Sequence, residues 1–262
     1  TSLRTVTGVQ TCALPILLLR GCLAIYYREM LILRKKLFKQ MASMSVGPIL
    51  YMIAFGFGMG RDVQVQGRLY IEFLIPGLIA MNSMTQAYAI ASEINIARFY
   101  WRIFEEFQAA PIRNMAYVTG EVLAGITRAL LSVAVVIVIG LLSGVVLSYN
   151  PWFWLAIVLN GFLFSSLAVC LAMLVRSHAD QALLTNFVIT PMAFLGGTFF
   201  PVERMPQWAQ NLLQFLPLTH AAHSIRSAAF GQPIEPGSYG LLAIMGTVLF
   251  VLAFFCVTQA KE

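Results

Sequence analysis

The stretch ALLSVAVVIVIGLLSGVVL, residues 129–147, decides the solvent in which this chain folds. It contains no Asp, Glu, Lys or Arg and is rich in β-branched and other aliphatic residues. A helix of about 20 mostly apolar residues crosses the hydrocarbon core of a bilayer, which is about 30 Å thick. We therefore predict a transmembrane helix here, extended backward to residue 117 by a part that projects beyond the membrane.

Five further uncharged runs of similar length are spread along the chain. Of its 262 residues, 59% are hydrophobic and 11% are charged, whereas soluble domains carry about 25% charged residues. We predict an all-α polytopic membrane protein, a single permease domain over residues 20–262. Its six transmembrane helices are expected near 41–59, 73–92, 117–147, 152–175, 183–200 and 239–257. Residues 1–16 lack the basic, amphipathic character of the segment after them, and we predict a non-native or disordered leader.

The location of the cationic residues predicts an orientation. If the N-terminus is inside, most Lys and Arg residues fall on the cytoplasmic side, and only Arg61, Arg68, Arg204 and Arg226 fall outside. Cytoplasmic enrichment of Lys and Arg sets the orientation of membrane proteins. We predict an integral protein of a bacterial-type cytoplasmic (inner) membrane with both termini in the cytoplasm.

Residues 23–39 have the pattern of a basic amphipathic helix. An apolar face contains Leu23, Tyr26, Tyr27, Met30, Leu33 and Leu37, and the opposite face contains Arg28, Lys35, Lys36 and Lys39. A helix of this kind lies in the headgroup plane, where its cations face anionic lipids. We predict an interface helix that either braces a moving subunit or serves as a passive anchor.

Two spans carry polar residues that need an explanation. Asn82 and Gln86 lie one turn apart in the second span, so their face meets another helix or a translocation path, with helix contact the favoured interpretation. Arg128 directly precedes a full-length uncharged run, so we expect it to snorkel at the inner boundary. Glu121 lies about 10.5 Å away along the helix axis, which is long for a direct pair.

The cytoplasmic segment between spans two and three predicts a second short amphipathic helix, which ends at Pro111. Its apolar stripe is Phe99, Ile103 and Phe107, and its charged residues include Arg98, Arg102, Glu105, Glu106 and Arg113. Aromatic residues beside charges suit a docking surface for another protein. A helix that rests on the bilayer is the alternative.

The segment between spans five and six, residues 201–238, is divided by prolines at 206, 217, 233 and 236. Its apolar pieces are too short to cross a membrane and too apolar for a free loop. We predict short re-entrant helices that gate the outer end of the path, with Pro201, Pro206, Trp208, Leu212, Phe215 and Pro217 as gate residues. His220 and His223 could share a metal, but no third ligand accompanies them, so no metal site is predicted.

Two strings carry a resemblance to a known family. FEEFQAAPIRNMAYVTGEVLAG, residues 104–125, and FLGGTFFPVERMPQWAQNLLQFLPLTHAAHSIR, residues 194–226, resemble the coupling-helix and outer segments of type-2 ATP-binding-cassette exporter permeases. Glu105, Pro111, Gly120 and Glu121 stand at matching positions of the first string. The LPLTH motif in the second is similar to the polysaccharide and nodulation-factor exporter branch. Phe107 and Gln108 depart from the family, where leucines are commoner.

The resemblance implies a half-transporter. Two six-helix subunits, identical or homologous, would surround a central path, and each would engage a separate cytoplasmic ATPase that binds ATP and magnesium. Phe99, Arg102, Ile103, Glu105, Glu106, Phe107, Pro111 and Glu121 would form the ATPase-coupling region. The substrate expected is an amphipathic or lipid-linked molecule such as a glycolipid, oligosaccharide or polysaccharide, with drugs or lipids as alternatives. Membrane lipids are expected partners and nucleic acids are not.

Two other classes of function fit the residues less well. An ion-coupled secondary transporter usually needs ionisable groups such as carboxylates near the bilayer midplane, and the six uncharged runs contain no carboxylate. An intramembrane enzyme needs clustered acid, base, nucleophile or metal groups, which the chain does not present. It also lacks the Gly-Lys dipeptide of a phosphate-binding loop, so we predict a non-catalytic subunit that binds no cofactor of its own.

Overall fold

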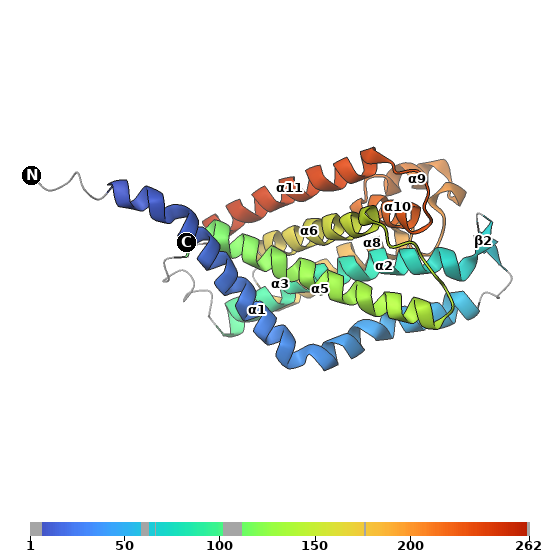
Figure 1. Ribbon diagram of the computed structural model, residues 1–262, viewed down its shortest axis with the longest axis horizontal. Coiled ribbons are helices and arrows are strands. Elements are labelled where there is room, and N and C mark those ends of the chain that lie inside the picture. The colour runs from blue at the N-terminus through green and yellow to red at the C-terminus, as the bar shows by residue number, and fades with distance from the viewer. Residues whose placement is uncertain (1–6, 59–62, 66, 102–111, 176, 261–262) are drawn as a thin grey trace, which may run out of the picture.

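A computed structural model describes residues 7–58, 63–65, 67–101, 112–175 and 177–260. The described chain is built from helices. In chain order they are α1 (Thr7–Tyr51), η1 (Met52–Phe57), α2 (Tyr70–Tyr88), α3 (Ile90–Asn95), η2 (Ile96–Tyr100), α5 (Asn114–Leu142), α6 (Pro151–Leu174), α7 (His178–Leu184), η3 (Thr185–Ile189), α8 (Thr190–Leu195), η4 (Val202–Arg204), α9 (Gln207–Leu213), α10 (Pro217–Ala229) and α11 (Pro236–Gln259). The start of α1 and the end of α11 lie at one end of the molecule, and α9 lies at the other (Figure 1).

A small hairpin, which the sequence pattern does not predict, precedes α2. Strands β1 (Gln64–Val65) and β2 (Arg68–Leu69) pair antiparallel. The turn between them contains Gly67, whose φ of 76° is readily adopted only by glycine.

Three helices within the described residues are long and apolar enough to cross a membrane, namely α5, α6 and α11. The other three predicted spans lie in less regular or more polar helices. The first occupies the end of α1 and η1, the second occupies α2 and α3, and the fifth is divided among α7, η3 and α8. The predicted helical class is therefore confirmed, and a count of six crossings stays a prediction.

The predicted interface helix is not a separate element, because residues 23–39 lie inside the continuous helix α1. The ribbon of α1 changes direction partway along (Figure 1). Residues 7–16, which fall in the predicted leader, belong to the same helix. Its exposed cations include Lys35, Lys36 and Lys39.

The buried face of α1 also differs from the predicted apolar stripe. Leu23 and Tyr27 are exposed, whereas Ile25, Glu29 and Leu33 are buried. The reason is that α1 packs against α5, and an ion pair with α5 brings Glu29 into the interface. A helical wheel that considers only apolar residues cannot identify a buried face that contains a carboxylate.

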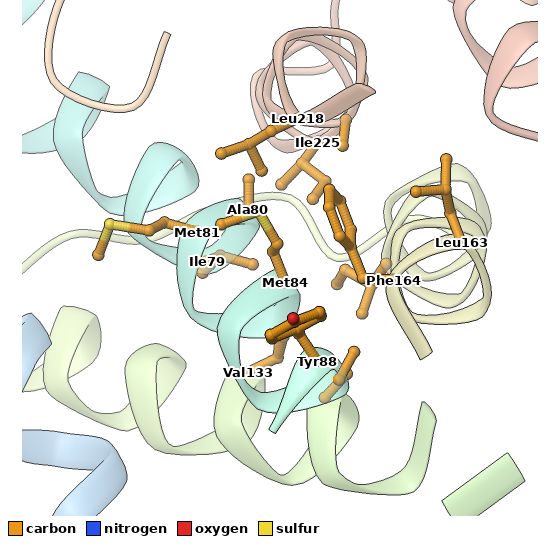
Figure 2. Close-up of a cluster of buried hydrophobic side chains, with 14 of the residues drawn as sticks. Ile79, Ala80, Met81, Met84, Tyr88, Val133, Leu163, Phe164, Leu218 and Ile225 are labelled. Atoms are coloured by element: carbon orange, nitrogen blue, oxygen red, sulfur yellow. The ribbon is translucent and has the colours of Figure 1, made fainter. Parts of the chain in front are cut away.

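The hydrophobic core forms where α2 crosses α5, α6 and α10. Figure 2 shows Met84 and Tyr88 of α2 beside Val133 of α5, Phe164 of α6 and Ile225 of α10. All five side chains are at most 3% exposed. Aromatic, sulfur-containing and β-branched residues thus fill the space between helices that are distant in sequence.

Proline positions shape the outer segment as the sequence predicts. Pro206 immediately precedes α9, and Pro217 and Pro236 are the first residues of α10 and α11. A proline at a helix start costs little, because its missing N–H has no intrahelical partner there. The segment is therefore divided into short helices, as expected, and their depth in a membrane stays a prediction.

Candidate functional site

A cavity of about 380 Å³ lies between the second half of α1, the junction of α2 and α3, and the η3–α8 region. Small-molecule sites are typically about 300 to 1,000 Å³. Both predicted path residues, Asn82 and Gln86, line this cavity, which we call the lateral groove. Its other polar and aromatic residues are Ser43, Tyr51, Thr85, Tyr88, Ser92, Thr185, Thr190 and Phe194.

A proline in α1 explains how Asn82 is held at the groove. Pro48 has no N–H, so the carbonyl of Met44, four residues earlier, lacks its usual intrahelical donor. The side-chain amide of Asn82 donates a long hydrogen bond of 3.5 Å to that carbonyl. The contact joins α2 to α1, so the predicted helix-contact role of Asn82 is present at a residue that also lines the groove.

A buried chain of hydrogen bonds fixes the opposite wall. The Asn95 amide donates to the Gln181 side-chain oxygen at 3.0 Å, and the Gln181 amide donates to the Tyr88 hydroxyl at 2.7 Å. All three residues are at most 3% exposed. These bonds join α3, α7 and α2, so the irregular η3–α8 wall is held to the rest of the bundle.

The helices on either side of the groove carry exposed apolar residues. On α1 and η1 they include Val46, Leu50 and Ile53, which are 54%, 58% and 54% exposed. On η3 and α8 they include Phe187 and Leu195, at 76% and 46%. Large apolar patches beside a polar groove mark surfaces that contact lipid or protein.

A second feature, the ion cluster, consists of Arg28, Glu29, Glu93 and Arg128. Arg128 is only 1% exposed and donates two hydrogen bonds to the Glu93 carboxylate, at 2.9 and 2.6 Å. It also lies 3.5 Å from Glu29, which accepts a hydrogen bond from Arg28 at 2.8 Å. The prediction that Arg128 snorkels is wrong, because two carboxylates from α1 and α3 provide the partners that a buried guanidinium requires.

The cluster joins α3, which precedes the predicted coupling residues from Phe99 to Pro111, to α5, which begins after them. Burial raises the pKa of Glu29, and the neighbouring Arg28 and Arg128 guanidinium groups oppose this effect. The charge of Glu29 therefore depends on cations from its own helix and from α5. The periodicity of apolar residues in the sequence does not predict this arrangement of charged residues.

Glu121, predicted to belong to the coupling region, is buried in α5 at 2% exposure. Its Oε2 atom has no hydrogen-bond partner among the described residues. The ion pairs of Arg128 within that part of the chain go to Glu29 and Glu93, in line with the axial separation of Arg128 from Glu121. A coupling role for Glu121 remains a prediction.

Most of the predicted coupling residues lie outside the described residues, namely Arg102, Ile103, Glu105, Glu106, Phe107 and Pro111. Phe99 is described, in η2, and is 37% exposed. Beside it, Arg98 donates to the carbonyls of Ala172 and Met173 at 3.2 and 2.9 Å. Arg98 thus caps the C-terminal end of α6, where cations are favourable.

The predicted gate residues lie on the short outer helices and their flanks. Trp208, Leu212 and Phe215 are 72%, 58% and 80% exposed. Of the prolines, Pro206 is exposed, whereas Pro201 and Pro217 are buried. The side chains of Trp208, Leu212 and Phe215 therefore point away from the protein core, and gating by them remains a prediction.

Comparison with known proteins identifies the family. The model of the ABC-2 type transporter family matches residues 20–230. The chain belongs to this family. Among similar proteins, the inner membrane transport permease YadH of Escherichia coli K12 is 31% identical over 214 residues, which are 79% of this chain and 81% of YadH.

Nodulation protein J provides further relatives of this ABC-2 permease. The protein from Rhizobium leguminosarum bv. viciae is 30% identical over 219 residues, 81% of this chain and 83% of that protein. The protein from Neorhizobium galegae is 30% identical over 254 residues, 94% of each chain. The predicted resemblance to the polysaccharide and nodulation-factor exporter branch is confirmed, and the apolar helices agree with an integral membrane protein.

Proposed function

We propose that this chain is the permease subunit of an ATP-driven exporter that moves an amphipathic, lipid-linked glycan outward. Membership of the ABC-2 family carries the proposal, because such permeases normally work with a cytoplasmic ATPase subunit. A relationship to nodulation protein J favours a glycan-bearing substrate. ATP and magnesium would bind to the partner ATPase.

The lateral groove is the part of the chain best suited to the path. Amide and hydroxyl groups of Asn82, Gln86 and Thr85 offer hydrogen bonds to a polar headgroup, and the exposed apolar residues beside the groove suit an acyl chain or helix. A second copy of the chain, or a homologous permease, would face this groove and close it. From the distribution of Lys and Arg, both termini and the coupling segment would be cytoplasmic.

The test is purification of the tagged chain, identification of any ATPase that accompanies it, and reconstitution in liposomes. We expect a P-loop ATPase to co-purify and ATP to drive a fluorescent glycolipid between leaflets. Glycolipid movement that does not depend on ATP but is driven by a proton gradient would instead favour ion-coupled transport. Failure of any ATPase to associate would remove the proposed mechanism.

A further inference from the structure

A second cavity, of about 500 Å³, lies in the outer segment and is separate from the lateral groove. Its walls come from the residues that directly follow α9, from α10 and from the start of α11. We call it the outer pocket. Its lining includes Gln214, Phe215, His223, Arg226, Glu235 and Ser238.

The floor of the outer pocket is fixed by Arg226. Its guanidinium group lies 3.8 Å from the centre of the Phe73 ring and donates a hydrogen bond of 2.9 Å to the Gly197 carbonyl. Gly197 itself has a φ of 76°, which positions this turn under α10. A side chain held from two sides is organised before any ligand arrives.

The charges of the outer pocket nearly balance. Arg226 contributes one cation, and Glu235 contributes one carboxylate, which lies 3.7 Å from Nδ1 of His223. The Glu235 carboxylate would repel a strongly anionic ligand. An acyl chain would leave the polar groups of the walls without hydrogen-bond partners. The balance therefore favours a neutral polar ligand.

The remaining groups match the chemistry of a sugar ring. Gln214 and Ser238 supply both donors and acceptors, as the alternating hydroxyl groups of a sugar require. Phe215 is 80% exposed and presents an aromatic face, against which the C–H face of a sugar can pack. Mixed polar groups around one exposed aromatic ring are poorly suited to a purely apolar ligand.

We propose that the outer pocket binds a neutral sugar unit of the substrate on the exit side of the permease. For the identity of the substrate class this inference rests on the proposed function. The pocket would hold the glycan after it leaves the path. Binding there needs neither ATP nor the ATPase, which makes it separable from transport.

The test uses the full-length chain in lipid nanodiscs without the ATPase. Fluorescently labelled neutral tetrasaccharides of glucose and of N-acetylglucosamine are titrated, and fluorescence polarisation is measured. We expect saturable binding of at least one of them, weakened at least fivefold by Gln214→Ala and by Phe215→Ala. Phe215→Tyr should retain binding because it keeps the aromatic face, and Gln207→Ala, an exposed glutamine on α9 outside the pocket, should leave it unchanged.

Three results would overturn the proposal. They are no saturable binding of either neutral probe, equal weakening by Gln207→Ala and Gln214→Ala, or tighter binding of an acidic oligogalacturonide than of the neutral sugars. Each variant is first checked for the unfolding temperature of the unaltered protein, so that loss of fold is not counted as loss of binding. If sugar binding fails while the ATPase still co-purifies and drives transport, only the proposal of sugar binding in the outer pocket is rejected. If no ATPase associates while sugar binding is intact, the proposed function is rejected instead.

Discussion

Removal of the buried guanidinium of the ion cluster by Arg128→Met should strongly destabilise the permease. Arg128 is 1% exposed and Glu29 is 3% exposed, so the substitution leaves a buried carboxylate without its α5 partner. Breaking a buried ion pair by removing one partner costs about 3 to 5 kcal/mol. Glu93→Gln should cost less, because Glu93 is 27% exposed and Arg128 keeps its contact with Glu29.

The double-mutant cycle Arg128→Met with Glu93→Gln isolates the contact between these two residues. Charged hydrogen bonds contribute about 1.5 to 3 kcal/mol, so we expect a coupling free energy of at least about 1.5 kcal/mol. The measurement is equilibrium unfolding of the purified permease in mixed micelles with increasing dodecyl sulfate, followed by tryptophan fluorescence.

Arg113→Met is the matched control, because Arg113 is an exposed arginine immediately before α5. It should change the free energy of unfolding by no more than about 0.5 kcal/mol. The reasoning is refuted if Arg128→Met costs no more than this control, or if the coupling free energy is indistinguishable from zero.

Four further predictions concern transport and orientation. Phe107→Ala should weaken ATPase association at least tenfold, about 1.4 kcal/mol, in quantitative co-purification; unchanged association would support a helix that merely rests on the bilayer. Asn82→Leu should lower ATP-driven glycolipid movement at least fivefold while the ATPase still co-purifies, because the groove loses a polar group and α1 loses a contact. Trp208→Asp should impair transport without loss of the ATPase, and normal transport would argue against an outer gate. In a cysteine-free background, an impermeant thiol reagent should label Gln232→Cys but not Lys36→Cys in intact cells, and the opposite pattern would invert the topology.

Local features of the fold could be predicted from the sequence because they depend on neighbouring residues. Pro206 and Pro217 mark helix starts directly, and Asn82 and Gln86 share a face through helical spacing alone. Both residues do line one cavity. These inferences need no knowledge of which helix packs against which.

Contacts between distant helices could not be predicted in the same way. Glu29, Glu93 and Arg128 come from three helices, and each residue alone resembles a surface charge near a membrane boundary. The link between Pro48 and Asn82 likewise depends on the packing of α1 against α2. Only the tertiary arrangement shows that a charge is buried or that a proline exposes a carbonyl to a neighbour.

The π-helical segment η3 has a consequence for insertions and deletions in this family. A π segment accommodates one extra residue within an otherwise α-helical run, and η3 supplies Thr185 and Ile189 to the groove. Deletion of a single residue there would restore a regular α-helix and leave the residues on either side close to their original facing, whereas the same deletion in a regular α-helix would rotate the two sides by about 100° relative to each other. A change of chain length by one residue at η3 would therefore leave the groove-facing side chains of the flanking helices in place.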